Sequence, residues 1–421
     1  MLNEKQVYTI KHNIHRMISA VKWVIFSIIS GLVIGAAGTL FSFLLAFVNI
    51  LRISHPWLIY LLPIGGLIIV GCYYLLHDQD DTGTNLVISS INAGDHLPFR
   101  MAPLIFVATL ITHLCGGSAG REGAALQLGG SVGNGIGSLF RFDEKDKHVM
   151  TMCGMSAAFS ALFGTPLAAA IFPIEVVSVG IMHYSVLLPC VIASLVAQAV
   201  ATTAGIAPET FVIAQIPDFT VGSSVKISVL AILCALVSIL FCLTLHGAAH
   251  LYKRFIKNPF LRIFVGGCIV IVLTLLVGNQ TYNGAGMDII IQCMEEATVR
   301  PEAFVLKMIF TAATLGAGFK GGEIVPSFSI GAAFGCLFGN LLGFSPTLCT
   351  AIGMIALFCG VTNCPLASLL ISFELFGYAG VPYFLLSVAF SYMLSGYFGL
   401  YHSQKIMYSK FKTKYINRKT I

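Results

Sequence analysis

The sequence predicts an all-α, polytopic membrane protein built from two related halves of tilted and broken helices. Of its 421 residues, 57% are hydrophobic and only 10% are charged, whereas an ordinary soluble domain carries about 25% charged residues. So few charged side chains cannot cover the surface of a soluble fold of this size. A soluble enzyme, a secreted disulfide scaffold and a disordered chain are therefore excluded as classes.

Apolar stretches follow one another almost without interruption. The first is too long for the core of a signal peptide and is expected to remain as a membrane helix. Several others are shorter than the ~20 residues that span a bilayer, and short apolar segments interrupted by glycine are typical of helices that end within the membrane at a transport site. The stretches are 23–51, 57–76, 101–115, 123–140, 148–182, 184–204, 227–252, 261–279, 303–318, 324–342, 347–376 and 378–400.

The chain contains an internal repeat. GMSAAFSALFGTPLAAAIFPIE (154–175) aligns with GMIALFCGVTNCPLASLLISFE (353–374) at a constant offset of 199 residues. Just upstream, GREG (120–123) aligns with GGEI (321–324) and places Glu122 over Glu323. Two halves that each carry a glutamate in a glycine-rich break are typical of a duplicated transporter. The sequence alone leaves open whether the halves are parallel or inverted.

The repeat and the charge pattern define five segments. Both ends are basic, which places both termini in the cytoplasm by the positive-inside rule. A nucleic-acid partner is not expected, because the basic tail adjoins so much apolar sequence. The segments are an N-terminal cytoplasmic piece (1–22), a first membrane repeat (23–204), a polar linker (205–226), a second membrane repeat (227–400), and a final short helix with a basic tail (401–421).

Glu122 is the strongest candidate for a functional group. In GGSAGREGAALQLGG it would begin a helix after a glycine run that leaves backbone N–H groups free. Such N–H groups and the helix dipole attract anions, and a carboxylate at the same place mimics a bound anion. Glu122 could alternate between filling an anion site and leaving it as a neutral acid. The structural alternative is a helix-capping carboxylate paired with Arg121.

The second break, GFKGGEIVPSFSIG, repeats this design, with a helix expected to begin near Pro326. The N–H groups of Ile324 and Val325 could point at an anion, and the alternative role for Glu323 is a structural bond at the repeat interface. Glu175 and Glu374 hold matching places at helix ends, and we expect them to lie at the water interface.

Two further motifs are weaker. Thr82-Gly83-Thr84-Asn85, which follows Asp81, offers hydroxyl and amide donors for a small hydrated anion, or forms an ordinary helix-capping turn. His246 and His250 have the spacing of a zinc pair, but no third ligand or HExxH motif accompanies them, so no metal or other cofactor is expected. The 12 cysteines occur singly and are interpreted as small buried residues.

Taken together, GREGAALQ, the GGEIVP break, the paired GTPLAAAIFPIE and NCPLASLLISFE helices, and GLYHSQ resemble the CLC family of chloride channels and anion–proton antiporters, in the same order along nearly the whole chain. The resemblance implies a homodimer in which each subunit is an inverted repeat with its own anion pathway. Glu122 matches the family's gating glutamate, and Tyr401 matches the tyrosine whose hydroxyl reaches the central site.

The resemblance also assigns the anion-binding positions. Gly120, Arg121 and Gly123 surround the gating glutamate, while Ile324 and Val325 fall in the segment whose N–H groups face the anion. Residues 82–85 stand where chloride-selective members carry G-S-G-I-P.

Departures from the family pattern favour fluoride as the transported anion. Thr82, Thr84 and Asn85 replace the serine-and-proline signature, Glu323 occupies an apolar position, and Val176 stands where chloride–proton exchangers often carry an inner proton glutamate. These departures are similar to those of the bacterial fluoride–proton antiporter branch. Fluoride accepts stronger hydrogen bonds than chloride, so extra donors help to replace its hydration shell.

The sequence therefore predicts a multi-pass protein of the cytoplasmic membrane that exchanges fluoride for protons and exports fluoride. The alternative of the same fold is a chloride channel of the voltage-gated type or a chloride–proton antiporter, and Val176 would favour a channel within that class. An intramembrane enzyme using His246, His250 or a buried glutamate is the alternative from another class. No enzymatic activity is expected.

Overall fold

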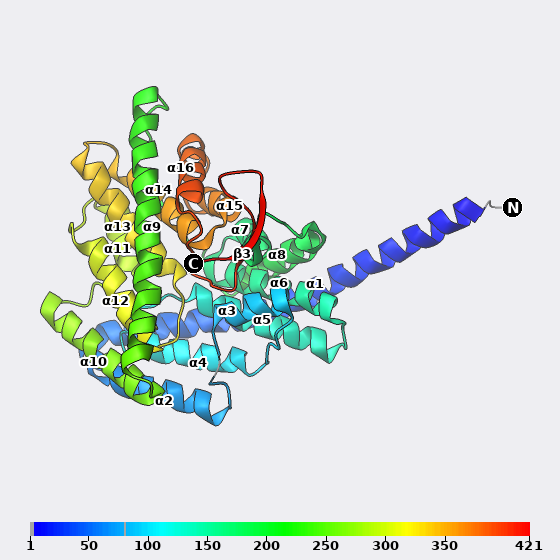
Figure 1. Ribbon diagram of the computed structural model, residues 1–421, viewed down its shortest axis with the longest axis horizontal. Helices are drawn as coiled ribbons and strands as arrows, with labels where there is room; N and C mark the ends of the chain where they lie inside the picture. The colour runs from blue at the N-terminus through cyan, green and yellow to red at the C-terminus, as the bar shows by residue number, and fades with distance from the viewer. Residues whose placement is uncertain (1–3, 80) are drawn as a thin grey trace.

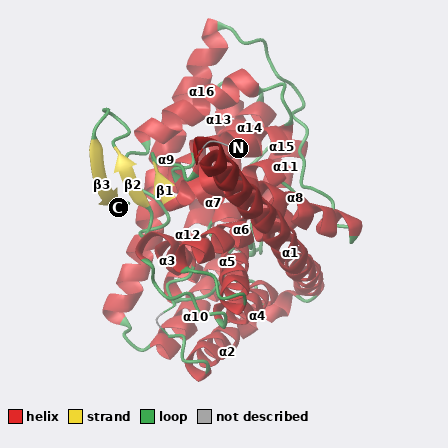
Figure 2. Ribbon diagram, turned by 90° about the vertical axis from the view of Figure 1, so that its right-hand side faces the viewer, coloured by secondary structure: helices red, strands yellow, loops and turns green. Residues whose placement is uncertain are grey.

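The computed structural model describes residues 4–79 and 81–421, and its helices form one body with a small sheet at its edge (Figures 1 and 2). Residues 1–3 of the expected N-terminal segment lie outside the described residues, and the rest of that segment continues directly into the first helix. In chain order the elements are α1 (Glu4–Ser54), η1 (Pro56–Leu61), α2 (Leu62–Leu75), α3 (Thr84–Ala93), α4 (Met101–Leu114), α5 (Glu122–Leu139), α6 (Glu144–Phe163), α7 (Pro166–Val177), β1 (Ser178–Val179), η2 (Tyr184–Val186), α8 (Leu187–Thr203), α9 (Val221–Phe255), α10 (Pro259–Val277), α11 (Met287–Glu295), α12 (Ala303–Ala317), α13 (Ile324–Leu341), α14 (Pro346–Thr362), α15 (Pro365–Phe376), α16 (Val381–Leu394), β2 (Lys405–Tyr408) and β3 (Tyr415–Lys419).

Within the described residues, six helical spans are long and apolar enough to cross a membrane. The remaining apolar helices are shorter, as the interrupted pattern of the sequence predicts. Large apolar side chains cover the outside of the longest helices, for example Leu236 and Leu240 on α9. An outer surface of this kind requires a lipid environment, so the chain is a membrane protein.

The two halves are inverted with respect to each other. The equivalent helices α7 and α15 lie side by side and run antiparallel, because each places its C-terminal glutamate at the first turn of the other. Glu175 of α7 accepts hydrogen bonds from the N–H groups of Leu366 (3.0 Å) and Ala367 (2.8 Å). Glu374 of α15 accepts from Leu167 (2.8 Å) and Ala168 (3.0 Å). The structure thus settles the relation that the sequence left open.

The expectation that these two glutamates lie at the water interface is wrong for Glu175. Its side chain is only 6% exposed, and both carboxylate oxygens are engaged at the start of α15. The first N–H groups of a helix have no partner within the helix, and a carboxylate satisfies two of them while complementing the helix dipole. Glu374, which is half-buried, performs the same role for α7.

Local sequence signals set several helix ends. Thr220 and Ser223 form a capping box, so α9 begins at Val221 and the linker ends six residues earlier than expected. Proline opens α7 and α15, where its missing N–H costs nothing. The helix of the second break begins at Ile324, two residues before Pro326, which occupies the third position of its first turn.

The expectation of a short helix after residue 401 is wrong. The segment instead forms β2 and β3, and β2 pairs with β1 in parallel and with β3 in antiparallel orientation (Figure 2). Ile406, Tyr408 and Tyr415 are residue types that favour strands, and β1 offers an unpaired edge. The Gln404 side-chain amide anchors the segment by donating to the carbonyls of Val176 (3.0 Å) and Thr362 (2.8 Å).

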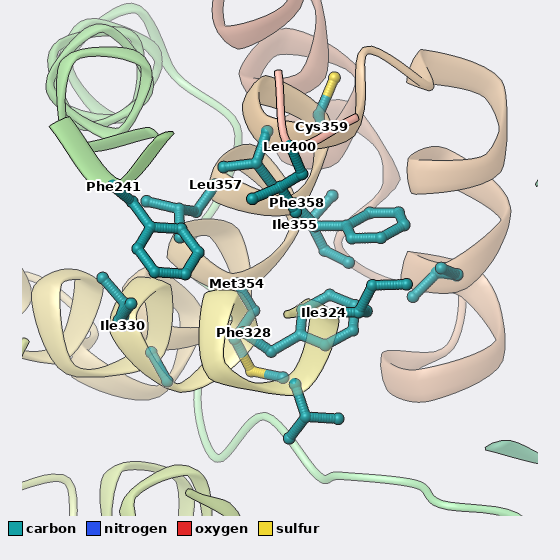
Figure 3. Close-up of a cluster of buried hydrophobic side chains, with 14 of the residues drawn as sticks. Phe241, Ile324, Phe328, Ile330, Met354, Ile355, Leu357, Phe358, Cys359 and Leu400 are labelled. Carbon is teal, nitrogen blue, oxygen red and sulfur yellow. The ribbon is translucent and has the colours of Figure 1, made fainter. Parts of the chain in front are cut away.

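A row of buried aromatic rings joins the two halves next to the start of α13. The ring centroid of Phe328 lies 5.0 Å from that of Phe358 (Figure 3). It also lies 5.8 Å from that of Phe163 in the first half. Phe358 in turn lies 5.9 Å from Phe172. Since lipid is as apolar as these rings, dense packing rather than exclusion from water holds the halves together here. This packing fixes Ile324, the first residue of α13.

Candidate functional site

The two glycine-rich breaks meet at the centre of the molecule. The first break (residues 115–121) separates α4 from α5, and the second break (residues 318–323) separates α12 from α13. Gly120 and Gly322 form an antiparallel bridge in which each N–H donates to the other's carbonyl at 2.7 Å. A Cβ atom on Gly120 would lie 2.9 Å from Pro326 Cδ, and one on Gly123 would lie 2.8 Å from Gly322 Cα. Only glycine allows the breaks to approach this closely.

Glu122 is the first residue of α5 and is fully buried. Its Oε1 accepts a hydrogen bond from Arg121 Nε and its Oε2 accepts one from the Arg121 N–H, both at 3.2 Å. Arg121 also pairs with Glu209 of the linker. The pairing with Arg121 that was the structural alternative is therefore present, and it places the carboxylate at the start of a helix as the sequence predicts.

Glu323 is the residue immediately before α13; the residue is partly buried, and its Oε2 atom is buried. Its Oε2 has no hydrogen-bond partner among the described residues. A Cβ atom on Gly123 would lie 3.1 Å from this oxygen and 3.6 Å from Thr84 Oγ1, so the two side-chain oxygens approach the same glycine. A buried carboxylate oxygen without a donor is energetically costly. The cost falls when the oxygen binds a proton or when a hydrogen-bond donor lies beside it.

The Thr82–Asn85 turn lies against the start of α5. Gly83 has φ +66°, which favours glycine, and it precedes α3. The buried Thr84 hydroxyl donates to the Gly123 carbonyl at 3.4 Å and accepts from Gln127 Nε2 at 3.2 Å. Gln127 Oε1 has no partner among the described residues. The turn therefore brings α3 and α5 together beside Glu323.

Thr82 and Asn85 face other surroundings. Thr82 is exposed and lines a cavity next to the turn. Asn85 Oδ1 accepts a hydrogen bond from the Ser403 N–H at 2.9 Å, which ties the turn to the segment after Tyr401. Of the four turn residues, Gly83 and Thr84 therefore lie closest to the breaks.

Tyr401 is buried, and its hydroxyl has no partner among the described residues. The backbone around it is held by Thr420 Oγ1, which donates to the Tyr401 carbonyl at 2.6 Å. Tyr401 thus carries a buried hydroxyl that no described residue satisfies.

Backbone donors complete the region. Within the part of the chain that the structure describes, the N–H groups of Gly123, Ile324 and Val325 have no acceptor. The Gly120 N–H, in contrast, is engaged by Gly322, and the Arg121 N–H is engaged by Glu122. Free donors therefore lie on the first turns of α5 and α13, at the positive ends of two helix dipoles.

A family model for the voltage gated chloride channel matches residues 65–396. The chain belongs to this family, the CLC family. It is 36% identical over 396 residues to a chloride/fluoride channel protein of Pseudomonas syringae pv. tomato, which covers 92% of this chain and 87% of that protein. Its fold matches a crystal structure of a CLC-type fluoride/proton antiporter with a TM-score of 0.88 and 31% identity, over 91% of this chain and 98% of that one. A slow cyanobacterial Cl⁻/H⁺ antiporter shares the fold, with a TM-score of 0.75 and 18% identity over 89% of this chain and 94% of that one.

Sequence reasoning missed several residues of this CLC site. Gln127 lies one and a half turns after Glu122 and bonds Thr84, but a single buried glutamine carries no sequence signal. Glu209 pairs with Arg121 across 88 residues. Lys320 forms a salt bridge with Asp81 across 239 residues. The sequence shows that Lys320 lies in the second break, but it does not show that Lys320 pairs with Asp81.

His246 packs against another histidine and a backbone carbonyl. Within residues 4–79 and 81–421, no group of three potential ligands is found. The His246 ring lies 3.9 Å from the ring of His402, and its Nε2 is 3.2 Å from the Leu400 carbonyl. His246 therefore packs beside Tyr401 as part of the support for that segment.

Proposed function

We propose that this protein is a proton-coupled anion transporter that exchanges fluoride for protons and exports fluoride. One observation carries the proposal: the fully buried Glu122 and the buried Oε2 of Glu323, each at the start of a helix, lie beside the Gly120–Gly322 bridge. The CLC membership of the chain and its likeness to a fluoride/proton antiporter support the same assignment.

The two glutamates have complementary roles in this proposal. Glu122 fills the anion site as a carboxylate and leaves it when it takes a proton, which opens the site to an anion. Glu323 has one oxygen without a donor in the described part of the chain, so it accepts the proton more readily than a fully hydrogen-bonded carboxylate does. A proton on either group removes a negative charge from the region and favours the anion there.

Fluoride suits the donors of this region. The free N–H groups of Gly123, Ile324 and Val325 point from two helix starts, and Thr84, Gln127 and Tyr401 supply polar side chains nearby. A small ion with a tightly held hydration shell needs many such donors to leave water. Thr82, Asn85, Gly83, Gly120 and Arg121 shape the approach to the site.

We further propose a homodimer in the cytoplasmic membrane with both termini in the cytoplasm. The basic residues at both ends support this orientation through the positive-inside rule. Since fluoride is exchanged for protons, an inward proton gradient drives fluoride out of the cell. The protein is expected to act as a transporter and to have no enzymatic activity.

The test is transport by the purified protein in liposomes loaded with fluoride or with chloride, followed by ion-selective electrodes while external pH is recorded. We expect fluoride efflux with matched proton uptake and little chloride movement. Glu122→Gln should abolish proton uptake, whereas Glu144→Gln, at an exposed position on α6, should leave it unchanged. Rapid chloride efflux without proton movement would instead make the protein a chloride channel, and proton uptake in Glu122→Gln would refute the mechanism.

A further inference from the structure

A salt bridge joins the two halves immediately beside the proposed site. Lys320 Nζ, in the second break, donates to Asp81 Oδ2 at 2.8 Å. The Asp81 side chain is 1% exposed, and its other oxygen, Oδ1, accepts from the Gly83 N–H at 2.8 Å. Asp81 therefore holds the Thr82–Asn85 turn with one oxygen and the second break with the other.

The ammonium of Lys320 is fixed from a second side. It lies 4.2 Å from the centroid of the Tyr73 ring, and Tyr73 on α2 is buried. A cation over an aromatic face and against a carboxylate loses most of its rotational freedom. Lys320 also stands three residues before Glu323, so its position fixes the start of α13 relative to the turn.

The pair borders a cavity of about 900 Å³. Thr82 lines this cavity, and besides Lys320 so do three basic residues: Lys253, Lys257 and Arg262. Lys253 and Lys257 are exposed, so the cavity is open to solvent. An anion that enters from this side meets the Lys320–Asp81 pair before it reaches Gly83 and Thr84.

The negative charge of Asp81 would repel such an anion. A carboxylate bonded to the Gly83 N–H lies beside the first turn of α3, and unpaired it would repel any anion that approaches that turn. At about 4 Å the repulsion between unit charges is ~1 kcal/mol in water and ~4 kcal/mol near a protein surface. Lys320 cancels this charge without removing the oxygen that Gly83 requires.

We propose that Lys320 and Asp81 form a positioning pair that sets anion affinity and selectivity. The pair fixes the Thr82–Asn85 turn against the second break and neutralises the carboxylate that would otherwise exclude anions from this side. Neither residue contacts the anion itself. The inference rests on the proposed function, because it assumes that the anion passes the turn.

The experiment compares Lys320→Met, the double variant Lys320→Met/Asp81→Asn, and Lys320→Arg in fluoride-loaded liposomes. Lys320→Met should raise the KM for fluoride about tenfold and lower the ratio of fluoride to chloride rates, because Asp81 is left unpaired. The double variant should bring the KM back to within about threefold of the wild type, since asparagine keeps an oxygen for Gly83 without the charge. Lys320→Arg should stay close to the wild type.

Lys253→Met is the matched control, because Lys253 lines the same cavity without a carboxylate partner among the described residues. An equal effect of Lys253→Met would mean that general charge in the cavity matters, and it would overturn the inference. So would a double variant no better than Lys320→Met. If the wild type moves no fluoride, the proposed function fails, yet the pair remains testable: purely additive shifts of Tm for Lys320→Met and Asp81→Asn in detergent would disprove the coupling.

Discussion

Removing the carboxylate of Glu175 should destabilise the protein far more than removing that of Glu374. Both groups bond two N–H groups at the start of an equivalent helix, so the chemistry is matched. They differ in the burial of the carboxylate, because Glu175 is 6% exposed whereas Glu374 is half-buried. The pair is therefore an internal comparison of one interaction in two environments.

The magnitude follows from the hydrogen bonds. A bond to a charged group contributes about 1.5–3 kcal/mol, so Glu175→Ala, which leaves the buried Ala367 N–H and the part-buried Leu366 N–H without their acceptor, should cost on the order of 3 kcal/mol. At Glu374→Ala water can replace the carboxylate, and the loss should be about 1 kcal/mol, as for an ordinary helix cap. Glu175→Gln keeps one acceptor and should fall between these values.

Thermal unfolding of the purified protein in detergent measures the difference. With an unfolding entropy of about 2 cal/mol/K per residue, 3 kcal/mol corresponds to a fall in Tm of about 3 °C for a chain of this length. Equal shifts for the two alanine variants would refute the reasoning from burial. Loss of proton uptake in Glu175→Gln with an unchanged Tm would show that Glu175 carries protons instead of capping α15.

Three further outcomes are expected. Glu323→Gln should retain anion movement but lose proton coupling, which simultaneous fluoride and pH recording would detect; unchanged coupling would remove Glu323 from the proton path. Gly123→Ala should abolish transport and lower the free energy of unfolding by about 1–3 kcal/mol, because its Cβ would lie 2.8 Å from Gly322 Cα. Gly71→Ala, with open space around it, should be neutral or stabilise slightly. Similar Tm values for both variants would contradict the close approach of the breaks. Burial lowers the pKa of Lys410, in the β2–β3 loop, to about 8. Between pH 8 and the ordinary pKa of lysine, the unfolded chain therefore binds more protons than the folded chain, and the free energy of unfolding should rise with pH across that window. Lys410→Met should lose this rise, and a wild-type Tm that stays flat or falls relative to that variant would argue against the burial of Lys410.

The sequence determined those features that depend on composition or on neighbouring residues. Its scarcity of charge required a membrane protein, and its repeat located two equivalent breaks. A glycine run followed by glutamate placed Glu122 at the first residue of α5, because glycine ends one helix and leaves free N–H groups for the next. The residues of the site were therefore largely visible in the sequence.

Only the tertiary structure decided how these residues meet. The inversion of the halves, the capping of α15 by Glu175, and the pairing of Asp81 with Lys320 join residues that lie 191 to 239 positions apart. The tail became a sheet because β1, more than 200 residues earlier, supplies its parallel partner. A local pattern specifies what a segment can form and which groups it leaves unsatisfied. Packing of the two halves decides which distant group satisfies each of them, and among the described residues it leaves Glu323 Oε2 without a partner beside Gly123.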